Sequence, residues 1–178
     1  MINKKTKTWL ITFIIVIAIM IDPKSVISFI FNDGYAISET VIQGIANVHD
    51  GDTLTINKQK IRLQGIDAPE LKQKCQKNEQ SYSCGIEAKQ QLLEFTDGLE
   101  VRCNIVDYDK YQRALGHCFV RDMNLNAQMV ASGHALAYID YSKLYLPQEI
   151  VARANRLGIH AGTYIEPWQW RRKNKHKH

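Results

Sequence analysis

Alternating apolar and polar positions predict β-strands in the first half of the chain. The three predicted strands span residues 41–48, 53–56 and 60–66. In the third of them Ile61 and Leu63 alternate with Arg62 and Gln64, which is typical of a strand with one buried face. The short polar stretch 57–59 predicts a hairpin turn between the second and third strands.

The second half of the chain mixes helical and strand patterns. It predicts helices over residues 85–97, 125–132 and about 147–158, and strands over residues 100–106 and 114–121. In the first helix Ala88, Leu92 and Phe95 share one face, and Gly98 is placed to end it. Five strands with a helix after the third match the oligonucleotide-binding (OB) barrel. We therefore expect a mainly β, α+β fold: a five-stranded OB-fold barrel with three helices. An α+β sandwich of the same elements is the alternative.

The N-terminus has the pattern of an export signal. Three lysines among the first seven residues precede an uncharged apolar run over residues 9–21. That run is short for a bilayer span, which needs about 20 residues. A second apolar patch follows at residues 26–31, so an uncleaved membrane anchor through residues 9–31 is the alternative, and a buried helix of the fold is a third. We expect an extracytoplasmic protein, periplasmic or secreted.

Composition fits this organisation. Residues 1–38 are interpreted as a signal peptide or membrane anchor with a connector, residues 39–170 as the domain, and residues 171–178 as a basic tail. The tail is expected to be solvated and disordered, or to act as an electrostatic tether for polyanions. The content of 45% hydrophobic and 23% charged residues is typical of a globular protein. The net charge of +5 favours contact with polyanions but does not by itself indicate nucleic acid.

The four cysteines support export. An even number of cysteines in an exported domain suggests disulfides, and four cysteines allow three pairings. We favour Cys75–Cys84 and Cys103–Cys118, because Cys103 and Cys118 are equally distant from the centre of the polar loop 107–113 and face each other if that loop joins antiparallel strands. Four reduced, buried thiols are the alternative. A zinc site is disfavoured, since the chain has no C-x-x-C pair.

Three short segments carry candidate chemistry. They are DGDT at residues 50–53, RLQGIDAPE at residues 62–70 and DKYQR at residues 109–113. The first two supply four carboxylates: Asp50, Asp52, Asp67 and Glu70. Oxygen ligands in this number suit a hard cation such as Ca²⁺ or Mg²⁺. Taken alone, however, DGDT is more typical of a turn.

The second segment needs a bend to bring its charges together. Arg62 and Asp67 are five residues apart and would point to opposite faces of a regular strand. Gly65 allows a bulge that turns both toward one site, and Pro69 fixes a turn that returns Glu70. Arg62 and Arg113 are then placed to bind phosphate oxygens through planar guanidinium groups. Glu70 is placed to accept a proton from an attacking water.

These segments resemble the thermonuclease (staphylococcal nuclease) family. DGDTLTI, IRLQGIDAPE and DKYQR match three family blocks in order and at fitting distances, and NAQMVASGHALAY resembles the later helix and strand. The resemblance covers residues 42–168, nearly the whole predicted domain. The four cysteines and the ending PWQWRR resemble the exported, cysteine-containing branch of the family.

The resemblance implies a calcium-dependent enzyme that cleaves DNA and RNA with little sequence choice, and we expect a monomer. It implies Ca²⁺ bound by Asp52, Asp67 and the carbonyl of Ala68, with Asp50 contributing through water. It implies Glu70 as general base and Arg62 and Arg113 as catalytic phosphate clamps. It also implies that Lys110 and Tyr111 contact a terminal phosphate, and that Tyr138 or Tyr141 stacks nearby.

Two departures and two competing functions accompany the resemblance. Ala68 replaces a threonine, which leaves a backbone carbonyl ligand in place. Gln112 replaces a frequent glycine; if that position needs a positive φ, Gln112 costs about 1 kcal/mol and shifts Arg113. A non-catalytic OB-fold module that binds nucleic acid is the main alternative function. A surface protein whose barrel binds another anion or a partner is the third.

Overall fold

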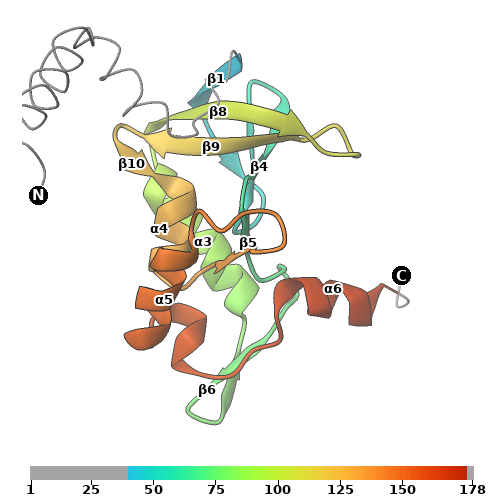
Figure 1. Ribbon diagram of the computed structural model, residues 1–178, viewed down its shortest axis with the longest axis vertical. Helices are drawn as coiled ribbons and strands as arrows, with labels where there is room; N and C mark the ends of the chain where they lie inside the picture. Colours follow the sequence, from blue (N-terminus) through green and yellow to red (C-terminus); the bar gives the residue numbers. More distant parts are fainter. Residues whose placement is uncertain (1–39, 176–178) are drawn as a thin grey trace, which may run out of the picture. The chain divides into compact units, whose positions relative to one another are not determined.

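A computed structural model describes residues 40–175 of the chain (Figure 1). The main sheet contains β1 (Thr40–Ile45), β2 (Asn47–Val48), β3 (Thr53–Ile56), β4 (Gln59–Leu63), β8 (Glu100–Tyr108), β9 (Ala114–Val120) and β10 (Met123–Asn124). Two small sheets pair β5 (Ile66–Asp67) with β11 (Leu136–Ala137), and β6 (Cys75–Lys77) with β7 (Gln80–Tyr82). The helices are α3 (Cys84–Thr96), α4 (Leu125–Ala131), α5 (Leu146–Ala154) and α6 (Pro167–Asn174), with a 3-10 turn, η1 (Gly158–Ala161).

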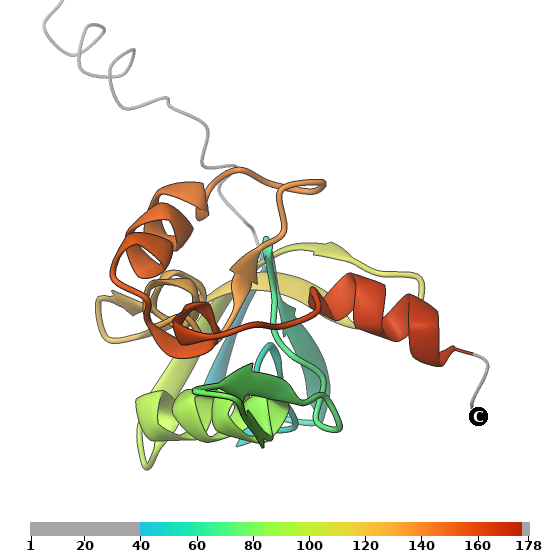
Figure 2. The same ribbon diagram turned by 90° about the horizontal axis from the view of Figure 1, so that it is seen from below.

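The main sheet curls because its first chain segment pairs at both ends of the strand order. That order is β1-β8-β9-β4-β3-β2, and only Ala46 separates β1 from β2. The segment therefore pairs with β8 through its first half and with β3 through its second. The pair β4–β9 is parallel, whereas the other pairs are antiparallel. With β1 and β2 counted as one strand and the short β10 set aside, this is the predicted five-stranded, OB-like α+β fold (Figures 1 and 2).

The predicted alternation decides which side chains enter the barrel core. Ile61 and Leu63 on β4 are buried, whereas Arg62 between them is only partly covered and faces the other way. On β9 every second residue is buried, from Ala114 to Val120. Hydrophobic burial on the inner face thus places Arg62 on the face where the candidate site lies.

The helices cover the lower part of the barrel. Figure 2 shows α3 running beneath the sheet, and its Ala88 and Leu92 are fully buried. Helices α4 and α5 pack against each other beside α3 (Figure 1). The predicted third helix was too long: α5 ends at Ala154, since Arg156 takes a left-handed φ of 53° that a helix cannot contain.

Two additions among the elements that the sequence patterns did not predict bear on the site. One is the β6–β7 hairpin, which precedes α3. The other is α6, which begins at Pro167, a favoured first helical position, and runs on to Asn174. The expectation of a disordered tail from Arg171 onward is therefore wrong for its first four residues, which are helical, although Arg172 and Lys173 are exposed as expected. The final residues 176–178 lie outside the described part.

Both predicted disulfides are confirmed. Cys103 and Cys118 lie directly opposite each other on β8 and β9. Cys75–Cys84 ties the β6–β7 hairpin to the first turn of α3. Two disulfides indicate that the protein matures in an oxidising, extracytoplasmic compartment. The predicted signal or anchor, residues 1–38, lies outside the described residues. Among the helices of residues 40–175, none has the length and apolar character of a membrane span.

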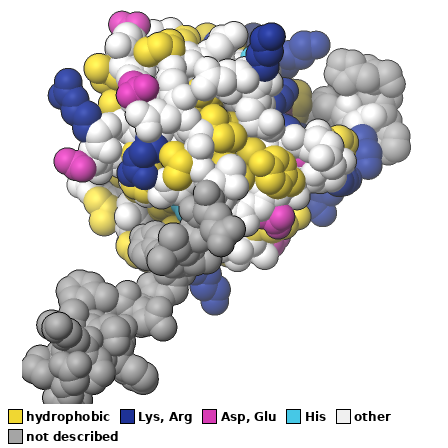
Figure 3. Space-filling model, turned by 90° about the horizontal axis from the view of Figure 1, so that it is seen from above, with side chains coloured by type: hydrophobic (Ala, Val, Ile, Leu, Met, Phe, Trp, Pro, Cys, Tyr) yellow, Lys and Arg dark blue, Asp and Glu magenta, His cyan; other side chains and the backbone are white. Residues whose placement is uncertain are grey.

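The positive charge is not gathered on the barrel end seen from above. Figure 3 shows Lys and Arg side chains scattered over the visible part of this face, with apolar side chains between them. The net charge therefore does not identify a binding surface on this face. A binding surface has to be identified from the positions of particular charged side chains.

Removing the Cys103–Cys118 disulfide should destabilise the barrel. The bond closes a loop with a sequence separation of 15 residues, so its loss should lower the free energy of unfolding by about 3 kcal/mol. We expect this for the double variant Cys103→Ala/Cys118→Ala in urea unfolding followed by circular dichroism. An unchanged free energy of unfolding would show that β8 and β9 do not depend on the bond.

Candidate active site

A cavity of about 850 Å³ lies where β4, the loop after β8, the segment after β11 and α6 meet. It is lined by all but one of the predicted catalytic, metal-binding and substrate-binding residues: Asp50, Asp52, Arg62, Ala68, Glu70, Lys110, Tyr111, Arg113, Tyr138 and Tyr141. The exception is Asp67, which is fully buried and reaches the site through the groups bound to it. The segments that carry Asp50, Lys110 and Arg171, each about 60 residues from the next, thus line the same cavity.

Arg62 joins the two central carboxylates. One of its terminal nitrogens donates to Asp52 Oδ1 at 2.8 Å, and the other donates to Asp67 Oδ1 at 2.5 Å. The predicted bend at Gly65 makes this possible, since Gly65 has a φ of 78° and reverses the chain between β4 and β5. Asp52 and Asp67 are therefore close enough to share one guanidinium group.

Asp52 is held by the backbone and by its neighbours. Its side chain accepts hydrogen bonds from the Thr53 hydroxyl at 2.9 Å and from the Ala68 amide at 3.0 Å. Its own amide donates to Asp50 at 3.1 Å. These contacts fix the carboxylate of Asp52 and bring the Ala68 peptide alongside it.

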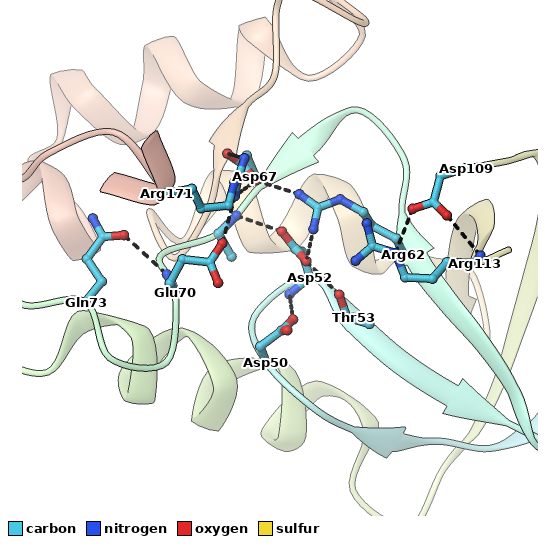
Figure 4. Close-up of polar contacts among 11 residues, drawn as sticks. Asp50, Asp52, Thr53, Arg62, Asp67, Glu70, Gln73, Asp109, Arg113 and Arg171 are labelled. Atoms are coloured by element: carbon cyan, nitrogen blue, oxygen red, sulfur yellow. Dashed lines mark hydrogen bonds and ion pairs between the residues drawn. The ribbon is translucent and has the colours of Figure 1, made fainter. Parts of the chain in front are cut away.

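Asp67 is bound by a second arginine that the sequence analysis did not assign to the site. Arg171 on α6 donates to both oxygens of Asp67 and also to Glu70, each at 2.8 Å (Figure 4). The ending PWQWRR carried this signal, but Arg171 was assigned to the basic tail. Its position 104 residues from Asp67 left no local spacing that links the two residues.

Glu70 lies on a loop that is fixed by a buried glutamine. The Glu70 amide donates to the Gln73 side chain at 3.2 Å, and the Gln73 amide donates back to the Glu70 carbonyl at 2.7 Å. Gln73 is fully buried and also donates to the Ile165 carbonyl at 2.6 Å. The loop carbonyl lies so close to α3 that a Cβ on Gly85 would stand 1.8 Å from it. No sequence pattern indicated Gln73 or Gly85.

Arg113 is held by a turn within the DKYQR segment. Asp109 accepts hydrogen bonds from the Tyr111 amide at 2.8 Å, the Arg113 amide at 3.0 Å and Arg113 Nε at 2.7 Å. Gln112 has a φ of 60°, so this position does take the left-handed conformation that glycine favours. The side chain of Arg113 still lines the cavity.

The four predicted substrate-binding residues form two groups on the cavity wall. Lys110 Nζ lies 5.0 Å from the centre of the Tyr111 ring, and Tyr111 is largely exposed. Tyr138 packs against Tyr141 at 4.7 Å and stacks on Trp168 of α6 at 5.3 Å, with ring planes 11° apart. Tyr141 is exposed, whereas Tyr138 is committed to a stack within the protein.

The carboxylates of the site outnumber the guanidinium groups that contact them. Arg62 and Arg171 contact Asp52, Asp67 and Glu70, and Asp50 accepts a hydrogen bond from the Asp52 amide; Lys60, Lys110 and Arg113 also line the cavity. Burial, together with the neighbouring Asp52, raises the pKa of Asp50 to about 6. Burial also raises the pKa of Asp67, although Arg171 and Arg62 oppose the shift. Ionising both Asp50 and Asp67 in this cluster therefore carries a free-energy cost.

A scan against family models matches residues 60–161 to the staphylococcal nuclease homologue family. The chain belongs to the staphylococcal nuclease family. The match spans β4 to η1 and so includes both Arg62 and Arg113.

Several relatives span most of the same domain. An uncharacterized endonuclease of Haemophilus influenzae is 37% identical, over 74% of this chain and 73% of its own length. A micrococcal nuclease of Shigella flexneri is 34% identical, over 74% of this chain and 80% of its own length. A probable staphylococcal-like nuclease of Oryza sativa, CAN2, is 32% identical over 68% of this chain, which spans only 31% of that protein.

The family is generally metal-dependent, and the donor chemistry of this site fits a hard cation. The available donors are carboxylate and carbonyl oxygens, as Ca²⁺ and Mg²⁺ prefer. Within residues 40–175 no three His, Cys, Asp or Glu side chains already form a metal-binding group. The reason is visible in Figure 4, where guanidinium groups occupy the oxygens of Asp67.

The close approach at Gly85 predicts a strong effect of adding one methyl group. Gly85→Ala must displace the Glu70 loop or the start of α3, and should cost about 2–3 kcal/mol of stability in urea unfolding. Gly98→Ala is the matched control, because Gly98 has a positive φ but nothing within 4 Å of the added Cβ. It should cost only about 1 kcal/mol. Equal losses would mean that the Glu70 loop does not depend on Gly85.

The pKa of Asp50 predicts a pH-dependent gain for Asp50→Asn in the presence of a chelator. Because the folded-state pKa of about 6 lies above the ordinary aspartate value of 3.8, the ionised carboxylate destabilises the fold, fully so above pH 6. Asparagine can still accept the Asp52 amide hydrogen bond. The variant should be more stable than the wild type by about 1–2 kcal/mol at pH 8, after allowance for solvent screening, and the gain should vanish near pH 4. Thermal unfolding across this range checks it; a gain independent of pH would contradict it.

Proposed function

We propose that the protein is a calcium-dependent nuclease that hydrolyses phosphodiester bonds in DNA or RNA with little sequence preference. The observation that carries this proposal is the convergence of carboxylates and arginines from three separate segments on one cavity. Membership of a family with nuclease-named relatives supports the same reaction class. A phosphate and a cation are the two ligands that such a mixed set of charges would bind together.

Arg62 and Arg113 are proposed to bind the phosphate that is cleaved. Hydrolysis builds negative charge on the phosphoryl oxygens, and fixed guanidinium groups stabilise that charge. Among the described residues, the Asp109 contact of Arg113 engages only Nε of its side chain, so the terminal nitrogens remain for phosphate. Arg62 is oriented by two carboxylates, which hold it rigid before substrate arrives.

Glu70 is proposed as the general base. Its side chain lines the cavity and is 31% exposed, so a water molecule can reach it. The loop that carries it is fixed by Gln73, and this keeps the carboxylate at one place on the wall. Accepting a proton from the attacking water would be its role.

Asp52, Asp67 and the carbonyl of Ala68 are proposed to hold Ca²⁺, with Asp50 contributing through water. The Ala68 amide donates to Asp52, so that the backbone at Ala68 lies beside the carboxylates. When bound, the cation would supply a positive charge that helps to stabilise the phosphoryl group.

The outer wall is proposed to bind the rest of the substrate. Lys110 and Tyr111 would contact a neighbouring phosphate, since both lie on the exposed loop that also carries Arg113. Tyr141, exposed at the rim, is better placed to stack on a base than Tyr138, which already stacks on Trp168. The enzyme is proposed to be exported by means of residues 1–38 and to act outside the cytoplasm, in line with its two disulfides. It is proposed to act as a monomer.

The proposal predicts calcium-dependent cleavage that is lost in three variants. Purified protein with intact disulfides should degrade single-stranded DNA and RNA with Ca²⁺ and not with a chelator. Arg62→Ala, Arg113→Ala and Glu70→Ala should each lower the rate by at least about 10²–10³-fold, as when a main transition-state donor is removed. Initial rates on a fluorescent oligonucleotide measure this.

Arg102→Ala is the matched control, because Arg102 lies on β8 over Phe119 and does not line the cavity. It should cleave at the wild-type rate. If the wild-type protein binds DNA without cleaving it, the non-catalytic module is favoured. If it neither binds nor cleaves DNA, a barrel that recognises another partner is favoured.

A further inference from the structure

Arg171 binds the same carboxylates that the proposed function gives to the cation and the general base. One terminal nitrogen donates to Asp67 Oδ1 and to Glu70 Oε1, and the other donates to Asp67 Oδ2, all at 2.8 Å. The guanidinium group of Arg171 therefore forms a bidentate salt bridge with Asp67. A two-pronged, charge-assisted pair of this kind is among the stronger polar contacts in proteins.

The position of Arg171 is determined by the docking of α6. Trp168 stacks on Tyr138, and Pro167 at the start of the helix is buried. Just before the helix, the Ile165 carbonyl accepts a hydrogen bond from Gln73, the residue that fixes the Glu70 loop. The segment that carries Arg171 and the loop that carries Glu70 are thus anchored to each other. The packing of α6 and the hydrogen bond from Gln73 therefore fix the position of Arg171 next to Glu70, unlike that of an arginine on an unconstrained surface segment.

The hydrogen bonds to Asp67 leave little room for another ligand. A carboxylate oxygen offers two lone pairs, and Asp67 Oδ1 already accepts from both Arg62 and Arg171. The remaining oxygen, Oδ2, accepts from Arg171. A cation that uses both oxygens of Asp67 must displace at least one of these donors. A cation that uses only the remaining lone pair of Oδ2 must still overcome repulsion from the adjacent guanidinium group.

We propose that Arg171 competes with the divalent cation for Asp67 and thereby lowers the cation affinity of the site. Of the two arginines, Arg171 is the one that yields, because its side chain is 37% exposed, whereas that of Arg62 is 18% exposed and lies on β4 of the main sheet. The inference rests on the proposed role of Asp67 as a cation ligand. It makes α6 a determinant of how much calcium the enzyme requires.

Calorimetric titration of the full-length protein with Ca²⁺ tests this competition directly, without substrate. Arg171→Gln should bind Ca²⁺ about tenfold more tightly than the wild type, because the strongest competitor is gone. Arg171→Lys, which keeps the charge but not the two-pronged bond, should fall between the two. Arg172→Gln is the matched control, since Arg172 is the exposed neighbour on the same helix; its calcium affinity should stay at the wild-type value.

Unchanged or weaker calcium binding by Arg171→Gln overturns the inference. If this variant does not fold, as judged by circular dichroism, Arg171→Lys carries the same test, and unchanged or weaker binding there overturns it. Asp67→Asn separates the two proposals. Wild-type binding that is lost in Asp67→Asn supports the assumed ligand even if Arg171 has no effect. Absence of any wild-type binding removes the calcium site itself, and the competition with it.

Discussion

The salt bridges from Arg62 to Asp52 and Asp67 are the interaction around which the cavity is organised. Two buried carboxylates close together would repel each other and lose hydration, which costs several kcal/mol unless cations compensate. Arg62 provides that compensation and links the turn before β3 with the strand after the Gly65 bend. The barrel core below is apolar, so that the charged groups are confined to its outer face.

The three arginines of the cavity are held in three different ways. Arg62 belongs to β4 and is fixed by the sheet. Arg113 is held by a local turn around Asp109, and Arg171 arrives on a helix from the end of the domain. The exposed fraction of the side chain therefore rises from Arg62 through Arg113 to Arg171, and the arginine proposed to make way for a cation is the most exposed of the three.

The sequence was most informative where local rules act. Alternation placed Ile61 and Leu63 inside and Arg62 outside, and Gly65 signalled the bend that joins Arg62 to Asp67. Contacts across long sequence distances left no such signal. Gln73 is linked to Ile165, and Arg171 to Asp67, by packing that depends on the finished fold. The helical part of the tail was missed because its strong basic charge suggested a segment exposed to solvent.

Closure of the barrel by its first strand has a consequence for the order of folding. The hairpins β3–β4 and β8–β9 join residues that are near in sequence and can form early. Strand β1 must wait for β8, since Thr40 pairs with Ile105, and closing so long a loop carries a large entropic cost. The N-terminal strand, although the first to be synthesised, is therefore expected to be among the last to take its place. If the N-terminal segment of a chain is still bound to something else, the edge of β8 stays unpaired until that segment is released.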